Sequence, residues 1–218
     1  FLPNKKELHF FDNDKNYMKG VRWYEHFFLE AKREQLRGEV TPAYLFFKDV
    51  PVRIRHTICS YNKIKFIVLL RNPVHRAYSQ YNMSLLMKKK ESLSFEQALF
   101  YERYRLDDYA GKINYSYLSR GFYSGQIINY FKYFNRDQFK FILYEDFVNN
   151  QFRVVNDILS FLGVREINTL SDKAVFRNEY GPMDPGTENI LFEIYSKEFS
   201  VLEGMLGIDL SVWREGRA

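Results

Sequence analysis

Cysteine is almost absent from this chain, since Cys59 is the only one among 218 residues. One cysteine cannot form an internal disulfide, which favours a reducing compartment and hence a cytoplasmic location, with a processed luminal domain as the open alternative. Cys59 stands among Ile58, Tyr61 and Ile64. We therefore expect it to be a small buried residue rather than a nucleophile.

Long apolar runs and clusters of metal ligands are also missing. No stretch approaches the length of a membrane span, and no signal-peptide pattern is present, so we expect no membrane span in this chain. No His/Cys group has metal-ligand spacing, and we expect no metal. Gly111-Lys112 is not a Walker A motif, because Ile113 stands where Ser or Thr is required.

Charge of one sign is not concentrated either. Lys and Arg number 32 and Asp and Glu 27, which gives a net charge of +5. The basic residues are scattered, so we expect no nucleic-acid partner, although an anionic small ligand is compatible. Hydrophobic residues make up 46% of the chain, including 17 Tyr and 21 Phe. This is enough for one sizeable core, and we expect a single domain over residues 1–218.

The most informative stretch runs from Lys65 to Tyr81. Its five apolar residues, 66–70, predict a fully buried strand. Asn72 can cap a helix and Pro73 fits a first helical turn. A strand that leads into a helix N-terminus favours an anion site, to which Arg71 would add a fork of donors and Ser79 a hydroxyl. The alternative is a buried strand that ends in a surface arginine.

The string Arg71-x-Pro73-x-x-Arg76-x-x-Ser79 resembles the 3′-phosphate-binding motif of sulfotransferases that use 3′-phosphoadenosine 5′-phosphosulfate (PAPS). This resemblance implies that Arg71 and Ser79 hold the 3′-phosphate of PAPS, or of its product adenosine 3′,5′-bisphosphate (PAP).

A second match lies near the start, where Glu7 and His9 alternate around Leu8. An extended segment would place both side chains on the same side, where they could act in acid/base chemistry. The alternative is a surface carboxylate beside a hydrogen-bonded histidine. The string Lys6-Glu7-x-His9-Phe-Phe-Asp12 resembles the segment that carries the catalytic base in heparan-sulfate-type and bacterial sulfotransferases. The resemblance implies that Glu7 takes the acceptor proton and that His9 orients it or binds substrate.

The order of the remaining segments is similar to the same family. Arg120-Gly121 opens a helix, residues 139–143 predict a second strand, and residues 152–162 an amphipathic helix that ends at Gly163. Leu106 to Tyr117 is polar and predicted to be irregular. By the resemblance Arg120 lies near the cofactor, and Arg177 precedes a Pro-Met loop over the 3′-phosphate. The implied fold class is α/β, a P-loop-like three-layer sandwich with a central parallel sheet flanked by helices.

Two features depart from the family pattern. Some glycan-modifying members carry a lysine where this chain has Val40. The Gly-rich loop whose lysine holds the 5′-phosphosulfate has no counterpart among the eleven glycines. We therefore expect that the natural protein has a further N-terminal portion with the first strand and this loop.

The resemblance implies an enzyme, a PAPS-dependent sulfotransferase that moves a sulfuryl group to a hydroxyl or amine of a glycan, a lipid or another small molecule. Two alternatives stay open at this point. One is a non-catalytic nucleotide-binding module, and the other is an ATP-dependent phosphoryl-transfer enzyme, which the absent Walker A motif disfavours.

Overall fold

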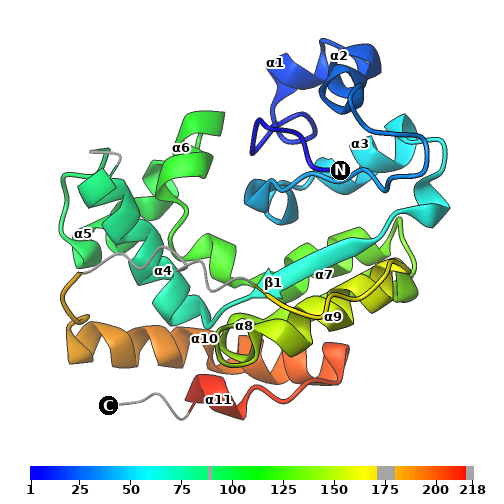
Figure 1. Ribbon diagram of the computed structural model, residues 1–218. Coiled ribbons are helices and arrows are strands. Elements are labelled where there is room, and N and C mark those ends of the chain that lie inside the picture. Colours follow the sequence, from blue (N-terminus) through cyan, green and yellow to red (C-terminus); the bar gives the residue numbers. More distant parts are fainter. Residues whose placement is uncertain (88–89, 171–179, 215–218) are drawn as a thin grey trace. The chain divides into compact units, whose positions relative to one another are not determined.

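A computed structural model describes residues 1–87, 90–170 and 180–214 (Figure 1). In this part of the chain the strands are β1 Phe66–Leu70 and β2 Phe139–Leu143. The longer helices are α3 Val50–Thr57, α4 Pro73–Asn82, α5 Phe95–Tyr101, α6 Tyr109–Tyr115, α7 Tyr123–Phe131, α9 Gln151–Leu162 and α10 Pro185–Leu206. The shorter ones are α1 Asp14–Tyr17, α2 Val21–Glu25, α8 Tyr144–Asn149 and α11 Ser211–Arg214.

The chain divides into two compact units. The first comprises residues 1–63 and 125–135, and the second comprises residues 64–124 and 136–218. The single domain over residues 1–218 that the composition predicts stays a prediction.

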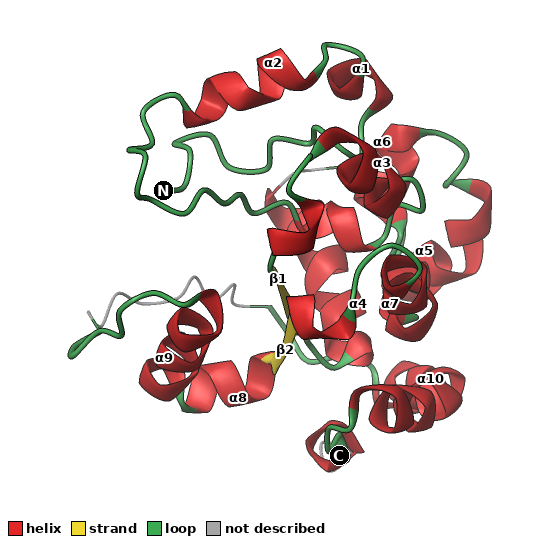
Figure 2. Ribbon diagram, turned by 90° about the vertical axis from the view of Figure 1, so that its right-hand side faces the viewer, coloured by secondary structure: helices red, strands yellow, loops and turns green. Residues whose placement is uncertain are grey.

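The second unit is built on a parallel pair of strands. β1 pairs with β2 from Phe66 opposite Phe139 to Leu70 opposite Leu143, and the rings of Phe66 and Phe139 stack with centroids 4.6 Å apart. Figure 2 shows α8 and α9 on one side of the two strands and α4 and α10 on the other. The sequence prediction of an α/β fold with a parallel sheet flanked by helices is confirmed. Parallel neighbours require crossover connections, which here are helical and cover the strands.

The bounds of β1 are as predicted, but its full burial is wrong. Leu70 is completely buried, whereas Ile67 is 44% and Leu69 51% exposed. Among the described residues β1 has β2 as its one strand neighbour. The side chains of Ile67 and Leu69, which share one face of the strand, are therefore only about half covered, although the run of apolar side chains is typical of a strand covered on both faces.

The turn between β1 and α4 is fixed by a residue far along the chain. The Asn72 side chain caps α4 by accepting from the Val74 amide at 3.0 Å, and its Nδ2 donates to the Trp213 carbonyl at 3.0 Å. Glu145, just after β2, accepts from the Asn72 amide and from the Trp213 indole N–H. Trp213 is fully buried. The first turn of α4 is thus held by the cap that the sequence predicted and by two partners that it did not.

Two local predictions for the second unit have opposite outcomes. Gly163 ends α9 as predicted and adopts the left-handed conformation, with φ of 71°. The other end of a helix, the start of α5, has a capping box formed by Ser94 and Gln97. The segment expected to be irregular contains α6, which Asp108 caps through the Gly111 amide. A side chain at Gly111 would meet the Arg105 carbonyl. This close approach lets a polar segment without apolar periodicity form a helix.

The first unit is organised around aromatic side chains. Phe10 is buried and packs on the rings of Tyr24 and Phe11, with centroids 4.7 and 4.9 Å away. Cys59, which we expected to be buried, is exposed, because it lies beyond the end of α3 rather than on its buried face. In the described ranges no helix is long and apolar enough to cross a membrane.

Candidate active site

Arg71 occupies the position between the end of β1 and the cap of α4. Its carbonyl accepts from the Tyr123 hydroxyl at 3.0 Å, and its guanidinium lies 4.9 Å from the centre of the Tyr144 ring. Two strand ends and the start of α7 therefore fix Arg71 from three directions. This backbone anchoring is the preorganisation that an anion-binding arginine requires.

The donor groups of Arg71 and Ser79 are not used within the described part of the chain. Neither the Arg71 guanidinium nor the Ser79 hydroxyl has a hydrogen-bond or ion-pair partner among residues 1–87, 90–170 and 180–214. Both side chains are half-buried and belong to the same strand–helix junction. Donors that are positioned but unpaired fit a phosphate, which offers several acceptor oxygens.

Arg71 also lines a cavity of about 390 Å³ in the second unit. His75 and Tyr78 of α4 form one wall, and the segment from Tyr180 to Pro185 with Glu188 of α10 forms another. The Tyr78 hydroxyl bridges these walls because it is 3.1 Å from the carbonyl oxygens of Gly181 and Pro182. The His75 and Glu188 part of this cavity was not expected, since α10 follows α4 by about a hundred residues.

The guanidinium groups of Arg76 and Arg120, the other two basic residues of this region, form hydrogen bonds with nearby protein groups. The Arg76 guanidinium donates to Gln80 at 2.7 Å and to the Tyr117 carbonyl. Arg120 donates to the Ser116 hydroxyl at 2.7 Å and to the Lys112 carbonyl at 3.1 Å. Arg76 thereby connects α4 to the segment before Arg120. A role for Arg120 at the cofactor stays a prediction, and Arg177 lies outside the described residues.

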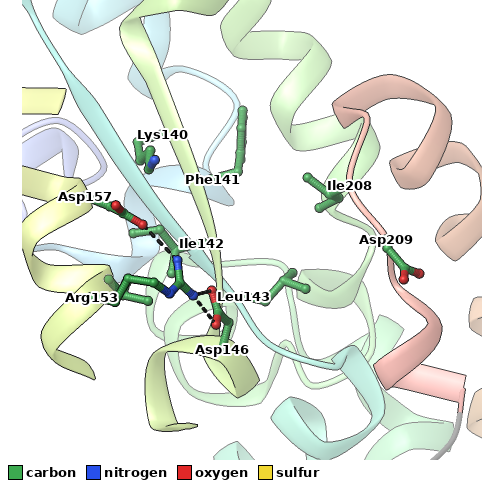
Figure 3. A pocket seen from close by; sticks show the side chains of 10 residues that line it. Lys140, Phe141, Ile142, Leu143, Asp146, Arg153, Asp157, Ile208 and Asp209 are labelled. Atoms are coloured by element: carbon green, nitrogen blue, oxygen red, sulfur yellow. Dashed lines mark hydrogen bonds and ion pairs between the residues drawn. The ribbon is translucent and has the colours of Figure 1, made fainter. Parts of the chain in front are cut away.

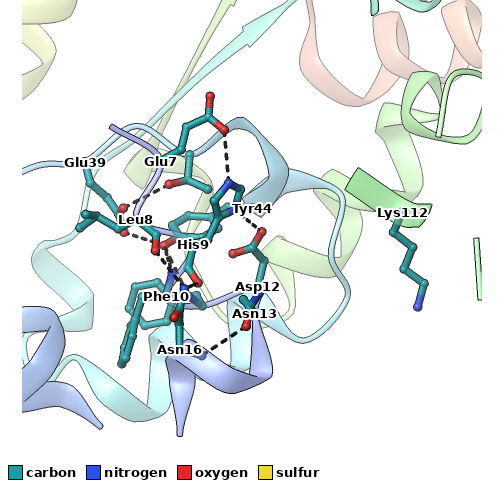
Figure 4. Close-up of polar contacts among 12 residues, drawn as sticks. Glu7, Leu8, His9, Phe10, Asp12, Asn13, Asn16, Glu39, Tyr44 and Lys112 are labelled. Atoms are coloured by element: carbon teal, nitrogen blue, oxygen red, sulfur yellow. Dashed lines mark hydrogen bonds and ion pairs between the residues drawn. The ribbon is translucent and has the colours of Figure 1, made fainter. Parts of the chain in front are cut away.

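The predicted acid/base pair forms a cluster in the first unit (Figure 4). His9 Nε2 lies 3.3 Å from a Glu7 carboxylate oxygen, and His9 Nδ1 lies 2.8 Å from Asp12 Oδ2. Glu7 is 55% exposed, His9 24%, and the Asp12 side chain is fully buried. The hydrogen bond to Asp12 raises the pKa of His9 above its usual value, burial lowers it, and the charges of Asp12 and Glu7 raise it again. An imidazolium with both N–H groups donating satisfies both carboxylates and holds the exposed Glu7 carboxylate in place. The catalytic roles of Glu7 and His9 stay predictions.

The backbone brings Glu7 and His9 together in an unexpected way. We predicted an extended segment, but neither residue lies in a strand, and their φ angles are 52° and 50°. Such left-handed conformations are uncommon for residues other than glycine and cost on the order of 1 kcal/mol each. The two side chains do face each other, as predicted, but through this strained turn rather than through strand alternation. Strain of this kind is often retained where it positions a functional group.

A half-buried carboxylate, that of Glu39, supports the turn through Tyr44. The Tyr44 hydroxyl accepts from the Phe10 amide at 3.0 Å and donates to Glu39 at 2.8 Å. Glu39 also accepts from Tyr24 and Thr41, and burial raises its pKa while these hydrogen bonds lower it. Val40, where some glycan-modifying members have a lysine, is 59% exposed, and its carbonyl accepts from the Glu7 amide.

A second cavity, of about 340 Å³, lies beside β2 (Figure 3). Its most prominent charge, Arg153 of α9, is paired with Asp146 and, at 2.9 Å, with Asp157. No predicted site residue lines it. Arg153 is thus paired within this cavity, whereas the Arg71 guanidinium has no ion-pair partner among the described residues.

Asp12 lies within the predicted catalytic-base segment, but the sequence motif indicated no role for it. The signal that could have found it is its spacing of three from His9, which suits a turn but not a strand. Nothing in the sequence indicated the contacts of Glu145 with Asn72 and Trp213. His75 lies inside the motif that identified Arg71, yet nothing in the sequence indicated a partner on α10.

Comparison with known proteins agrees with this architecture. A solved sulfotransferase from Alicyclobacillus acidocaldarius superposes with a TM-score of 0.80 and 29% sequence identity, covering 98% of this chain and 88% of that one. The model of the family described as "Sulfotransferase domain" matches residues 3–181. The chain therefore belongs to the sulfotransferase domain family.

Several curated relatives are heparan sulfate enzymes. Heparan sulfate glucosamine 3-O-sulfotransferase 5 of Mus musculus is 31% identical over 139 residues, which is 63% of this chain and 38% of the relative. The 3-O-sulfotransferase 3B1 of Mus musculus is 30% identical over 175 residues, which is 79% of this chain and 42% of the relative. The chain thus spans about two fifths of the length of these relatives.

Proposed function

We propose that this protein transfers the sulfuryl group of PAPS to a hydroxyl acceptor, leaving PAP. The observation that carries the proposal is that each unit holds one preformed feature. In the second unit the Arg71 guanidinium, at a capped strand–helix junction, has no hydrogen-bond or ion-pair partner among the described residues. In the first unit His9 and Asp12 hold the exposed Glu7 carboxylate. Family membership supports the same reaction.

The residues present fit the 3′-phosphate of the donor. Arg71 supplies a planar fork that matches phosphate oxygens, and Ser79 supplies a hydroxyl. PAPS, when bound, supplies an activated sulfuryl group with a good leaving group. The protein has little covalent chemistry to perform, so positioning and charge dominate its contribution, as in phosphoryl transfer.

Glu7 removes the proton from the acceptor hydroxyl in this proposal. His9 keeps the carboxylate oriented, and the buried Asp12 keeps His9 charged and in place. We place Arg120 and Arg177 near the cofactor by family resemblance, as secondary contacts to be tested. The single Cys59 leads us to propose a reducing, cytoplasmic location.

The acceptor that we propose is a glycan hydroxyl. The relatives named above act, by their names, on heparan sulfate glucosamine. An amine, a lipid or another small molecule would be the alternative acceptor, and a panel of these with radiolabelled PAPS would rank them.

The central experiment combines transfer and binding measurements. Glu7→Gln should lower the rate of transfer by about 10²- to 10⁴-fold, the usual contribution of a general base, with PAP affinity by calorimetry unchanged. Glu30→Gln, an exposed position in the same unit, is the matched control. Arg71→Ala should weaken PAP binding strongly, and Arg71→Lys should weaken it less, since a point charge cannot copy the fork.

Two outcomes would overturn the proposal. Unchanged PAP affinity in Arg71→Ala would remove the cofactor assignment. Thermal stabilisation by ATP but not by PAP would instead favour the phosphoryl-transfer alternative, because only a ligand that binds the native state raises stability.

A further inference from the structure

Helix α10 carries apolar side chains on its exposed side as well as on its buried side. The buried side packs into the second unit through Leu191, Phe192, Tyr195, Phe199, Leu202 and Leu206. On the exposed side, Ile190, Ile194 and Val201 are 62%, 42% and 48% exposed. A helix that covers only one core has polar residues on its opposite face, so a second apolar face indicates a second contact.

The exposed apolar residues have the spacing of a surface that pairs with another helix. The four positions Ile190, Ile194, Lys197 and Val201 follow one another at intervals of four, three and four residues. Such intervals place side chains along one line of a helix and are those of the a and d positions in coiled coils. The aliphatic stem of Lys197 can continue the apolar line while its ammonium stays in water. We call these four residues the α10 stripe.

Two opposite charges belong to the same exposed side of α10. Glu193 and Lys197 are both exposed. Within the described part of the chain, the Glu193 carboxylate and the Lys197 ammonium form no ion pair, with each other or with another residue. Both groups can therefore pair with a second molecule that lies along the stripe.

A second copy of α10 matches these features when it runs antiparallel to the first. With a two-fold axis beside the stretch between Ile194 and Lys197, Ile190 of each copy lies opposite Val201 of the other. Glu193 of each copy then lies beside Lys197 of the other, so the symmetry creates two ion pairs. A parallel pair in register would instead place like charges side by side. The stripe is therefore complementary to itself, as a two-fold interface requires.

We propose that this protein forms a two-fold symmetric dimer by antiparallel packing of the α10 stripe against the stripe of a second copy. This inference goes beyond the proposed sulfuryl transfer and does not depend on it. The apolar side chains supply the affinity, because burying them removes apolar surface from water, whereas exposed ion pairs contribute little. The charges select the antiparallel direction, because the parallel one brings like charges together.

The test is sedimentation velocity of the whole chain at low ionic strength, over about 1 to 100 µM protein. Wild type should shift from monomer to dimer as its concentration rises. Ile194→Glu should weaken dimerisation by about a hundredfold or more, because the symmetric interface would bury the introduced charge twice. Ile128→Glu is the matched control, because Ile128 on α7 is 47% exposed and lies outside the stripe. It should leave dimerisation unchanged.

Charge reversal tests the direction of the helices and decides the question even if Ile194→Glu fails to fold. Glu193→Lys places a lysine beside Lys197 of the other copy and should weaken dimerisation about tenfold at low salt. Lys197→Glu should have the same effect. The double variant Glu193→Lys/Lys197→Glu exchanges the two charges and should restore the affinity of wild type.

Three results would contradict the proposal. A wild-type protein that stays monomeric over the whole range would overturn it and would leave the stripe to a partner of another kind. A dimer that tolerates Ile194→Glu would show that a different surface pairs. A dimer that Ile194→Glu disrupts, but that the double charge exchange fails to restore, would contradict the antiparallel arrangement.

Discussion

At the scale of one residue, the contacts of His9 fix the geometry of the Glu7–His9–Asp12 cluster. Its two ring nitrogens face Glu7 and Asp12, of which Asp12 is buried and Glu7 exposed. Asp12→Asn replaces the carboxylate, whose hydrogen bond contributes most to the raised pKa of His9, with a neutral amide that can accept only a weaker hydrogen bond and carries no charge. We expect the pKa of His9, followed by NMR titration of the imidazole protons, to fall in this variant. Asp14→Asn, an exposed carboxylate on α1, should leave the titration in place.

The same shift gives stability a pH dependence of defined sign. The pKa of His9 is higher in the folded than in the unfolded state, so its contribution is fully present below the unfolded value near 6.5 and is lost as pH rises through the folded value. The thermal midpoint of wild type should therefore fall between pH 6 and 8 by more than that of Asp12→Asn. Equal slopes for the two proteins would contradict this account of His9.

The sequence identified Glu7 and His9 by resemblance, but their geometry could not be predicted from it. Strand alternation was the simplest way to place residues i and i+2 on one side. The chain instead uses two left-handed residues, and no local pattern specifies a positive φ for Glu or His. Asp12 contacts His9 Nδ1 because this turn brings its carboxylate next to the imidazole.

At the scale of elements, the cap of α4 is the most consequential. Asn72→Ala removes the hydrogen bond to the Val74 amide and leaves the buried Trp213 carbonyl without its donor. We expect a loss of about 1–2 kcal/mol in the free energy of unfolding, measured by urea denaturation, together with weaker PAP binding because Arg71 is adjacent. Ser94→Ala, which removes the cap of α5, should cost similar stability without changing PAP affinity.

The turn that carries Glu7, the proposed catalytic base, depends on Tyr44. Tyr44→Phe removes the acceptor of the Phe10 amide and a donor to Glu39. An unsatisfied buried amide costs about 1–3 kcal/mol, so we expect this loss in unfolding free energy and a reduced rate of transfer with unchanged PAP affinity. The control is Tyr101→Phe, because Tyr101 is 45% exposed. A fully active Tyr44→Phe would show that the turn is held by other contacts.

Elements with strong local signals were predicted from sequence. Strands β1 and β2 and the start of α4 were predicted because the patterns that specify them, an apolar run or an Asn-Pro pair, lie within the element itself. The capping box at Ser94 is a local pattern of the same kind. The prediction failed at α6, whose apolar periodicity is weak. It also could not find the His75–Glu188 pair, because long-range packing of α4 against α10 creates that contact.

At the scale of the whole molecule, the residues proposed for cofactor binding and those proposed for acid/base chemistry belong to different units. Arg71, Ser79 and Arg120 belong to the second unit, and Glu7, His9 and Asp12 to the first. Under the proposed function, PAP should slow amide hydrogen exchange in residues 71–79 and 116–121. Arg71→Ala should abolish this protection. Protection that persists in Arg71→Ala would contradict the assignment of cofactor binding to the second unit.

The hydrogen bond from Asn72 to Trp213 joins residues that are 141 positions apart. During synthesis, the start of α4 leaves the ribosome long before its second anchor exists. The strand and helix around Arg71 can form early, but the geometry around that arginine is completed only after Trp213 has been made. A nascent chain that ends before Trp213 should consequently retain the nucleotide less well than one that contains it.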